Sequence, residues 1–289
     1  MVAYEREQSI VRVVQSLPRL GPNLKLAIHD NSAVPLHFTD VRRIADEFQL
    51  PIRIEHCLDN CGFARACNSL ARSSDATVLL FLNPDAEVMA WPGRFQIAGT
   101  INGIIGPRIV DDQDRALATY GRRRTIAEEF FQRWARVRPS MPMGEGYVSG
   151  AALLVQRNDF LALNGFDESF FMYYEDIDLC LRANQSGIPV TVEPSWVVRH
   201  EGGHAAKRDS GTALIRSYDS ARYFYSKHGG NVALYRGLCW FDAIMRLALF
   251  SILPARRSSV PAVRRLLAHI STTQAIKLGS SARTSENAS

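Results

Sequence analysis

The feature that most constrains the fold of this chain is an alternation of amphipathic helices and short apolar strands along its first 85 residues. Helices are expected at 5–17, 38–50 and 62–74, and strands at 24–32, 52–57 and 76–85. The last strand is apolar without interruption, as suits a parallel strand that is covered on both faces. This order predicts a doubly wound α/β sheet.

Two acidic turns follow strands of this predicted sheet. Asp30 and Asn31 end one strand, and "NPDAEV" at 83–88 ends another. Ligands of open parallel sheets bind beyond the carboxyl ends of the strands, so both turns are expected at the ligand edge. From the residues alone, Asp85 and Glu87 form either an ordinary polar turn or a place to hold a divalent cation.

The remainder of the chain continues the α/β pattern, although residues 89–146 are harder to interpret. Strands are expected at 104–112, 147–157, 189–194 and 195–203, and helices at 125–137, 158–166 and 175–187. At the start, "MVAY" resembles only the last residues of a strand, so the first strand is expected to be truncated.

Composition indicates a globular protein in a reducing compartment. The chain has 289 residues, of which 46% are hydrophobic, enough for a packed core. Its five cysteines are odd in number and scattered, which argues against a secreted disulfide framework. Cys57, Cys61 and Cys67 lack C-x-x-C spacing and are expected to be ordinary buried thiols, not a zinc site. Without a signal peptide or an apolar stretch of roughly 18 residues, a cytoplasmic location is expected.

Positive charge is concentrated at the C-terminal end. The net charge is +5, yet residues 216–289 contain eleven Lys or Arg against three Asp or Glu. Such a segment can meet nucleic acid or anionic lipid, and its apolar content favours lipid.

Residues 231–253 are expected to form an amphipathic helix. Its three charged residues, Arg236, Asp242 and Arg246, fall within an arc of roughly 120°, which leaves a broad apolar face. That face either packs against protein or lies in a membrane interface. The second alternative is supported by the arginines that follow the helix, namely Arg256, Arg257, Arg264 and Arg265.

Three further segments contain candidate site residues, each with an ordinary structural alternative. Asp176 follows an aromatic run at 170–174 and could accept a proton at the rim of a pocket, whereas Asp178 is better explained by an i,i+4 pair with Arg182. Gly62 could bring a helix N-terminus close to an anion, or could simply precede a helix. "HEGGHAAKR" at 200–208 could supply a metal ligand or a phosphate clamp through His200, His204, Lys207 and Arg208, whereas a lone histidine after a strand is more often structural.

Taken together, these motifs resemble glycosyltransferase family 2. The motifs are "DN" at 30, "N-x-G-F-x-x-x-x-N" at 60–68, "NPDAEV" at 83, "SGAALLVQR" at 149, "GFDESFFMYYEDIDLCLR" at 165 and "H-x-x-G" at 200. The resemblance covers roughly residues 2–228 and is greatest to bacterial rhamnosyltransferases. It implies a GT-A fold, a mostly parallel sheet with helices on both faces, and an inverting displacement on a nucleotide sugar.

The resemblance also implies a role for each matching residue. Tyr4 and Asp30 would contact the nucleotide base, Asn60 and Gly62 would lie near the nucleotide and donor, and Lys207 would help to bind them. Asp85 would hold Mg²⁺ or Mn²⁺ on the diphosphate, with His200 facing the metal and Glu87 in the second acidic place. Asp176 would be the general base.

The sequence therefore predicts a metal-dependent glycosyltransferase that uses dTDP-rhamnose or a UDP-sugar and a glycolipid or polysaccharide acceptor. Residues 1–228 would form the catalytic domain, 229–275 a basic helical extension and 276–289 a disordered tail. A peripheral position at the inner face of the cytoplasmic membrane and a homodimer are compatible with this hypothesis; a nucleic-acid partner is not expected. The alternatives are a catalytically impaired scaffold or glycan-binding module, and a sugar nucleotidyltransferase.

Overall fold

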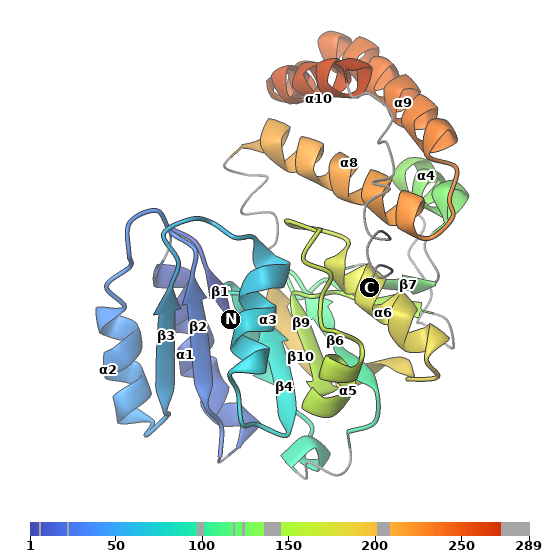
Figure 1. Ribbon diagram of the computed structural model, residues 1–289. Coiled ribbons are helices and arrows are strands. Elements are labelled where there is room, and N and C mark those ends of the chain that lie inside the picture. Colours follow the sequence, from blue (N-terminus) through green and yellow to red (C-terminus); the bar gives the residue numbers. More distant parts are fainter. Residues whose placement is uncertain are drawn as a thin grey trace, which may run out of the picture.

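The computed structural model combines two β-sheets, flanking helices and a layer of C-terminal helices (Figure 1). It describes residues 1–5, 7–21, 23–96, 101–117, 119–122, 125–135, 146–200 and 209–272. The predicted tail at 276–289 and Lys207 lie outside these ranges.

The first sheet and its helices show the predicted alternation of helices and strands. Its strands β1 (Val2–Ala3), β2 (Leu26–Asp30) and β3 (Ile52–His56) are all parallel. The helices are α1 (Gln8–Ser16), α2 (Thr39–Glu47) and α3 (Phe63–Arg72). Each helix buries its apolar stripe, as α1 does with Ile10, Val13 and Val14. Parallel pairing brings the carboxyl ends of the three strands to the same edge.

The second sheet has the strand order β4-β9-β6-β10-β5 and is mixed. Its strands are β4 (Val78–Leu82), β5 (Ala86–Ala90), β6 (Ile104–Val110), β9 (Ala152–Gln156) and β10 (Val190–His200). Only the pairing of β6 with β10 is parallel, so antiparallel pairs are more common here than expected. The chain also forms α5 (Arg157–Ala162), α6 (Glu175–Gln185) and 3-10 turns at Leu17–Leu20, Gly93–Gln96 and Pro254–Ser259.

Three strand predictions were wrong in detail. β5 was missed, because "NPDAEV" looked like a turn alone. Residues 147–157 were expected to be one strand, but a turn separates β8 (Gly146–Val148) from β9. Residues 189–203 were expected to contain two strands, whereas β10 runs through Pro194 with a shift in its register. Proline interrupts the ladder locally and is tolerated at such an irregularity.

The short β1 leaves a break between the two sheets. β1 pairs with β2, and β4 pairs with β9, so neither strand bridges the gap. A cavity of about 600 Å³ lies there, lined by Met1, Leu26, Leu79 and other apolar side chains. The amino group of Met1 donates a hydrogen bond to the Ala27 carbonyl at 2.9 Å, and burial lowers its pKa.

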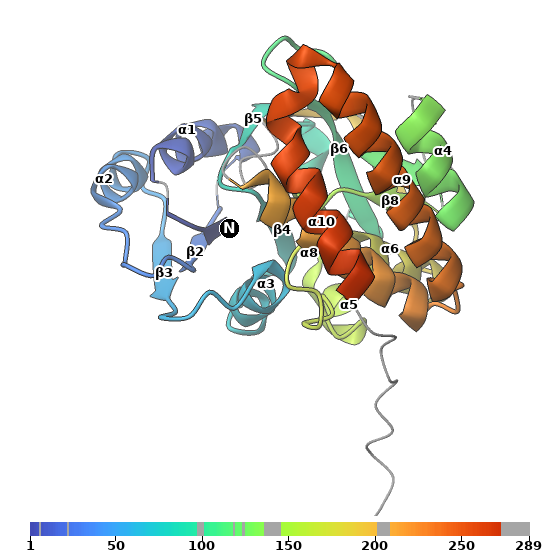
Figure 2. The ribbon, with the colours of Figure 1, turned by 90° about the horizontal axis from the view of Figure 1, so that it is seen from above.

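The helical layer contains α8 (Ser210–Lys227), α9 (Val232–Ile252) and α10 (Val260–Thr272). Figures 1 and 2 show this layer over the second sheet, with the first sheet to one side. α4 (Ile126–Ala135) lies beside it, and β7 (Tyr120–Arg122) pairs with β8. Within the described part of the chain, every helix is too short or too polar to span a bilayer.

Candidate functional site

The centre of the candidate site is a carboxylate and an imidazole that lie together at the end of the second sheet. Asp85 lies in the turn between β4 and β5, and His200 is the last residue of β10. Antiparallel pairing places His200 opposite Ala86, so Asp85 Oδ1 lies 3.1 Å from His200 Nε2. The Asp85 side chain is 8% exposed and that of His200 15%. A carboxylate oxygen is a ligand that suits Mg²⁺ and Mn²⁺, and an imidazole nitrogen is a common transition-metal ligand.

Asp176 lies on the same edge as this pair. The Asn83 amide, two residues before Asp85, donates to the Ala151 carbonyl at 2.9 Å. In the turn between β8 and β9, the Gly150 amide, directly before Ala151, donates a hydrogen bond to Asp176 Oδ2 at 2.7 Å. A Cβ on Gly150 would lie 3.3 Å from the Cβ of Asp176, so glycine permits this close approach. Two hydrogen bonds, one on each side of the Gly150–Ala151 segment, therefore connect the turn of Asp85 to the carboxylate of Asp176.

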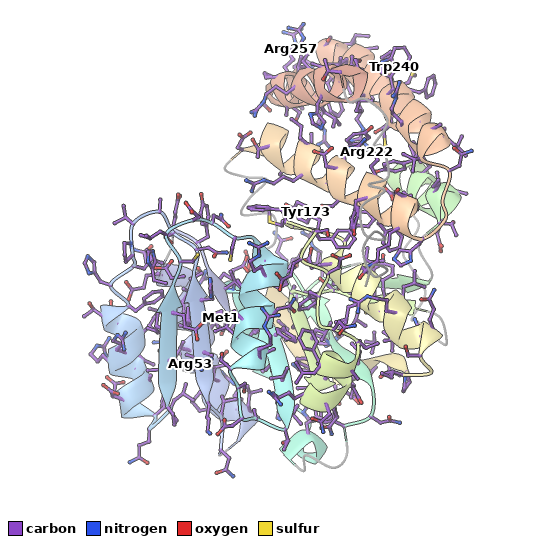
Figure 3. All side chains as sticks on the ribbon, in the orientation of Figure 1. Met1, Arg53, Tyr173, Arg222, Trp240 and Arg257 are labelled. Atoms are coloured by element: carbon purple, nitrogen blue, oxygen red, sulfur yellow. The ribbon has the colours of Figure 1, made fainter. Side chains whose placement is uncertain are left out.

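The chain enters α6 through a strained backbone. Tyr173 and Tyr174 have φ values of 74° and 70°, in the left-handed region that bulky residues rarely adopt. Figure 3 shows Tyr173 between α8 and the upper end of the sheets. Strain of this kind costs of the order of 1–3 kcal/mol per residue and tends to cluster at functional sites. Here it directs the first turn of α6, which contains Asp176, toward the Gly150 turn.

The other two acids of α6 are both buried, but they differ in their surroundings. Burial raises the pKa of Glu175 well above its usual value, and the charge of Asp176 raises it further. Asp178 is fully buried and contacts Arg182 at 2.8 Å, Lys227 at 2.7 Å and His228 at 2.8 Å. The predicted pair of Asp178 with Arg182 is confirmed, and Asp178 is a structural residue.

Gly62 connects the first sheet to the aromatic loop before α6. Its φ is +83°, and a Cβ there would lie 2.5 Å from the Phe171 carbonyl oxygen. The next amide, that of Phe63, donates to the same oxygen at 2.9 Å. Only glycine fits this crossing, so the start of α3 is held against the loop that leads to Asp176.

The structure brings the described members of the predicted nucleotide-contacting set to one edge, but it gives two of them local roles. Both carboxylate oxygens of Asp30 accept backbone amides, from Ser32 at 3.0 Å and Leu36 at 2.8 Å. Asn60 Oδ1 accepts the Gly62 amide at 3.0 Å. Tyr4 follows β1 and is 46% exposed. Asp30 and Asn60 thus shape the edge, and Tyr4 presents a ring to solvent.

Glu87 does not join the contact between Asp85 and His200, the other two predicted metal ligands. It lies within β5, opposite Arg199, and its Oε2 is 3.8 Å from Arg199 Nη1. Arg199 also contacts Asp114, at 3.1 Å. Among the described residues, Glu87 thus lies beside Arg199, whereas Asp85 contacts His200.

A buried carboxylate missed from the sequence supports the approach to α6. Glu129 of α4 is fully buried. Its carboxylate accepts hydrogen bonds from the phenol groups of Tyr174 at 2.6 Å, Tyr225 at 2.7 Å and Tyr235 at 3.3 Å. These tyrosines come from the start of α6, from α8 and from α9. Nothing local in "TIAEEFFQRW" distinguishes Glu129 from its neighbour Glu128, because its three partners are distant in sequence.

Replacing Glu129 by alanine is expected to lower the free energy of unfolding by about 3 kcal/mol or more, because it leaves three phenol groups without this buried acceptor. Glu128→Ala is the matched control in the same helix and is expected to cost less than about 1 kcal/mol. Urea unfolding followed by circular dichroism measures both. Equal destabilisation by the two changes would contradict the structural role of Glu129.

Comparison with known sequences confirms the predicted resemblance. Over 126 residues, 42% of this chain, the sequence is 35% identical to the N-acetylglucosaminyl-diphospho-decaprenol L-rhamnosyltransferase of Mycobacterium tuberculosis. It is 41% identical to rhamnosyltransferase WbbL of Escherichia coli over 58 residues, 20% of this chain. The match spans 38% of the first relative and 22% of the second. No family model matches the chain.

Comparison with solved structures confirms the GT-A fold. A mannosyltransferase from Pyrobaculum calidifontis, in complex with GDP-Man and Mn²⁺, aligns with a TM-score of 0.54 and 14% identity over 93% of this chain and 84% of its own. GalNAc-T7 with UDP, GalNAc and Mn²⁺ aligns with a TM-score of 0.51 and 14% identity, over 82% and 53% of the two chains.

Proposed function

We propose that this chain transfers a sugar from a nucleoside diphosphate to a hydroxyl of a lipid-linked or cell-envelope glycan, with inversion at the reacting carbon. Rhamnose is the proposed sugar, because the relatives with matching sequence are rhamnosyltransferases. The observation that carries the proposal is the shared edge of the Asp85–His200 pair and Asp176, connected through Asn83, Ala151 and Gly150.

On the donor side, the proposal assigns metal binding to Asp85 and His200. A divalent cation bound there would neutralise the charge that develops on the departing diphosphate. Tyr4 would contact the base and Gly62 would lie near the nucleotide, although the Gly62 and Phe63 amides already donate to Asn60 Oδ1 and to the Phe171 carbonyl. Glu87 is assigned a supporting role through its contact with Arg199. Lys207 is still proposed to bind the diphosphate.

On the acceptor side, Asp176 is the proposed general base. The acceptor hydroxyl attacks the sugar carbon as the bond to the diphosphate breaks, and Asp176 takes the hydroxyl proton. The Gly150 amide orients one carboxylate oxygen. Burial raises the pKa of neighbouring Glu175, and the charge of Asp176 raises it further, which favours the neutral form of Glu175 beside the base.

The decisive test is a screen of nucleotide sugars, dTDP-rhamnose first and UDP-sugars next, with a membrane extract as the source of acceptor. Transfer of labelled sugar to lipid, dependent on Mn²⁺ or Mg²⁺, is the expected result. Release of pyrophosphate would instead indicate a nucleotidyltransferase. Absence of both turnover and nucleotide-sugar hydrolysis would favour a scaffold or glycan-binding module.

We also infer that the helical layer binds a membrane surface. The buried residues of α9 include Tyr235 and Asp242, and Asp242 contacts Arg246 at 2.9 Å. The apolar side of the helix is exposed, including Trp240 at 45% and Phe241 at 56%. Figure 3 shows Trp240 on α9 and Arg257 in the turn after it, both on the side of the layer remote from the sheets. Such a face suits a lipid interface, and exposed arginines beside it suit anionic head groups.

Changing Arg256 and Arg257 together to alanine is expected to reduce binding to vesicles that contain anionic lipid by roughly 30-fold, at about 1 kcal/mol per arginine. Trp240→Glu with Phe241→Glu should abolish it. The matched control is Val34→Glu with Leu58→Glu, which adds the same charge at exposed apolar residues in the loops after β2 and β3. Vesicle flotation measures all of these, and equal flotation of both glutamate pairs would show that α9 is not the membrane contact.

A further inference from the structure

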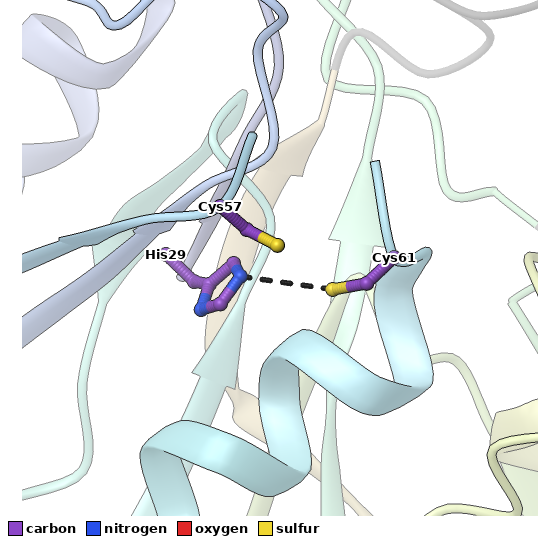
Figure 4. Close-up of side chains that lie close together, drawn as sticks. All are labelled: His29, Cys57 and Cys61. Atoms are coloured by element: carbon purple, nitrogen blue, oxygen red, sulfur yellow. Dashed lines mark hydrogen bonds between the residues drawn. The ribbon is translucent and has the colours of Figure 1, made fainter. Parts of the chain in front are cut away.

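A histidine and two cysteines gather at the ligand edge of the first sheet, apart from the Asp85–His200 pair. His29 lies in β2, Cys57 follows β3 and Cys61 precedes α3. Their ligand atoms all lie within 4.8 Å of one another. Figure 4 shows the two sulfur atoms and the imidazole converging, with Cys61 Sγ 3.6 Å from His29 Nε2.

Long-range pairing produces this cluster. β2 and β3 are parallel with His29 opposite Glu55, and the Cys57 amide continues the ladder by donating to the Asp30 carbonyl at 3.0 Å. The chain then turns back at Asn60 to place Cys61 beside His29. The C-x-x-x-C spacing alone gave no reason to expect a site, because the histidine comes from another strand.

The geometry suits a thiophilic metal. With Zn–S bonds of about 2.3 Å and Zn–N bonds of about 2.0 Å, the N to S edge of a tetrahedral site is about 3.6 Å. The separation of His29 Nε2 and Cys61 Sγ is 3.6 Å. Two thiolates and an imidazole prefer Zn²⁺ or Cd²⁺, whereas carboxylates prefer Mg²⁺ and Mn²⁺.

A second, independent observation concerns Nδ1 of His29, the ring nitrogen that does not face Cys61. His29 is 7% exposed, and its Nδ1 has no hydrogen-bond partner among the described residues. A carboxylate oxygen, Glu55 Oε2, is 3.8 Å from Nδ1. Histidines that bind metal through Nε2 donate Nδ1–H to such a carboxylate, which fixes the ring. A small movement of Glu55 would complete this arrangement.

We propose that His29, Cys57 and Cys61 form a three-ligand site for a thiophilic divalent cation, of which Zn²⁺ is the natural example. The fourth position is open to water or to Asn31 Oδ1, which accepts the Cys61 thiol at 3.3 Å. Cys61 directly precedes Gly62, so the ion braces the turn that holds α3 against the aromatic loop.

The test is a Cd²⁺ titration of the full, reduced chain. We expect one equivalent of Cd²⁺ to bind with a thiolate-to-metal absorption band and to raise the unfolding temperature. Cys57→Ala and Cys61→Ala should each weaken binding at least tenfold. Cys67→Ala, which removes a buried thiol of α3 that lies outside the cluster, is the matched control and should leave binding unchanged.

Glu55→Gln keeps all three ligands and should weaken Cd²⁺ binding roughly 10-fold, as loss of an outer-shell partner does. This variant decides the matter if the cysteine variants fold poorly. Asp85→Asn should leave Cd²⁺ binding unchanged, and excess Mn²⁺ should not displace Cd²⁺. The proposal is overturned if the thiolate band is absent, if Cys57→Ala binds as the wild type does, or if the mass of the protein under reducing conditions shows a persistent Cys57–Cys61 disulfide.

Discussion

Replacing Asp176 by asparagine is expected to lower kcat by roughly 10²- to 10⁴-fold, while the dissociation constant of the donor nucleotide stays within about twofold of the wild type. The amide cannot accept the proton of the acceptor hydroxyl. It can still accept the Gly150 amide, which the carboxylate does at 2.7 Å, so the geometry of the turn is retained. The effect therefore reports proton transfer. Steady-state transfer rates and nucleotide titration measure the two quantities.

The control for this experiment is Asp75→Asn, which removes a carboxylate from an exposed pair with Lys25 and should leave kcat unchanged. Asp178→Asn is an informative contrast in the same helix, because Asp178 is buried among Arg182, Lys227 and His228. Its loss should lower the free energy of unfolding. If Asp176→Asn turns over at the wild-type rate, Asp176 is not the base.

Most of the regular structure could be predicted because it depends on local periodicity. The apolar stripe of α1 and the unbroken apolar run of β4 are visible within windows of ten residues. β5 was missed because its start at Ala86 follows a turn signal and its pairing partner, β10, lies about a hundred residues later. Short strands of this kind are defined by their partners and not by their own residues.

The features of the candidate site also fall into two groups, those visible in a local stretch of sequence and those that depend on strand pairing. The acidic turn at Asp85 and the helix start at Asp176 could be found from sequence, since each follows a recognisable element. The contact of Asp85 with His200 and that of Glu87 with Arg199 depend on the register of β5 against β10. The gathering of Cys57 and Cys61 around His29 likewise depends on the register of β2 and β3. A sequence does not display such registers.

The exposed apolar face of α9 was only half predictable. Periodicity placed Arg236, Asp242 and Arg246 on one side of the helix, but it left open which side would face the protein. In the structure the buried side includes Asp242, and the exposed side includes Trp240. Packing against α10 decides this choice, and the ion pair of Asp242 with Arg246 offsets the cost of burying a charge there.

Replacing Asp85 by asparagine is expected to weaken Mn²⁺-dependent binding of a nucleoside diphosphate by about 100-fold or more. Losing an outer-shell partner already costs 10- to 100-fold in metal affinity, and a direct ligand should cost at least as much. Calorimetry with and without Mn²⁺ isolates the metal-dependent part, and binding without Mn²⁺ should change little. Unchanged Mn²⁺ dependence would place the metal elsewhere.

Glu87→Gln decides between the two acids of this turn. Both lie near the start of β5, but Asp85 contacts His200 at 3.1 Å, whereas Glu87 lies 3.8 Å from Arg199. If only Asp85 binds the cation, Glu87→Gln should reduce Mn²⁺-dependent binding less than about fivefold, as expected for a partly exposed ion pair. A loss as large as that of Asp85→Asn would make Glu87 a second metal ligand. Each variant removes one carboxylate from the same turn. The ratio of their effects on Mn²⁺-dependent binding therefore separates direct metal ligation from the general effect of negative charge in the turn.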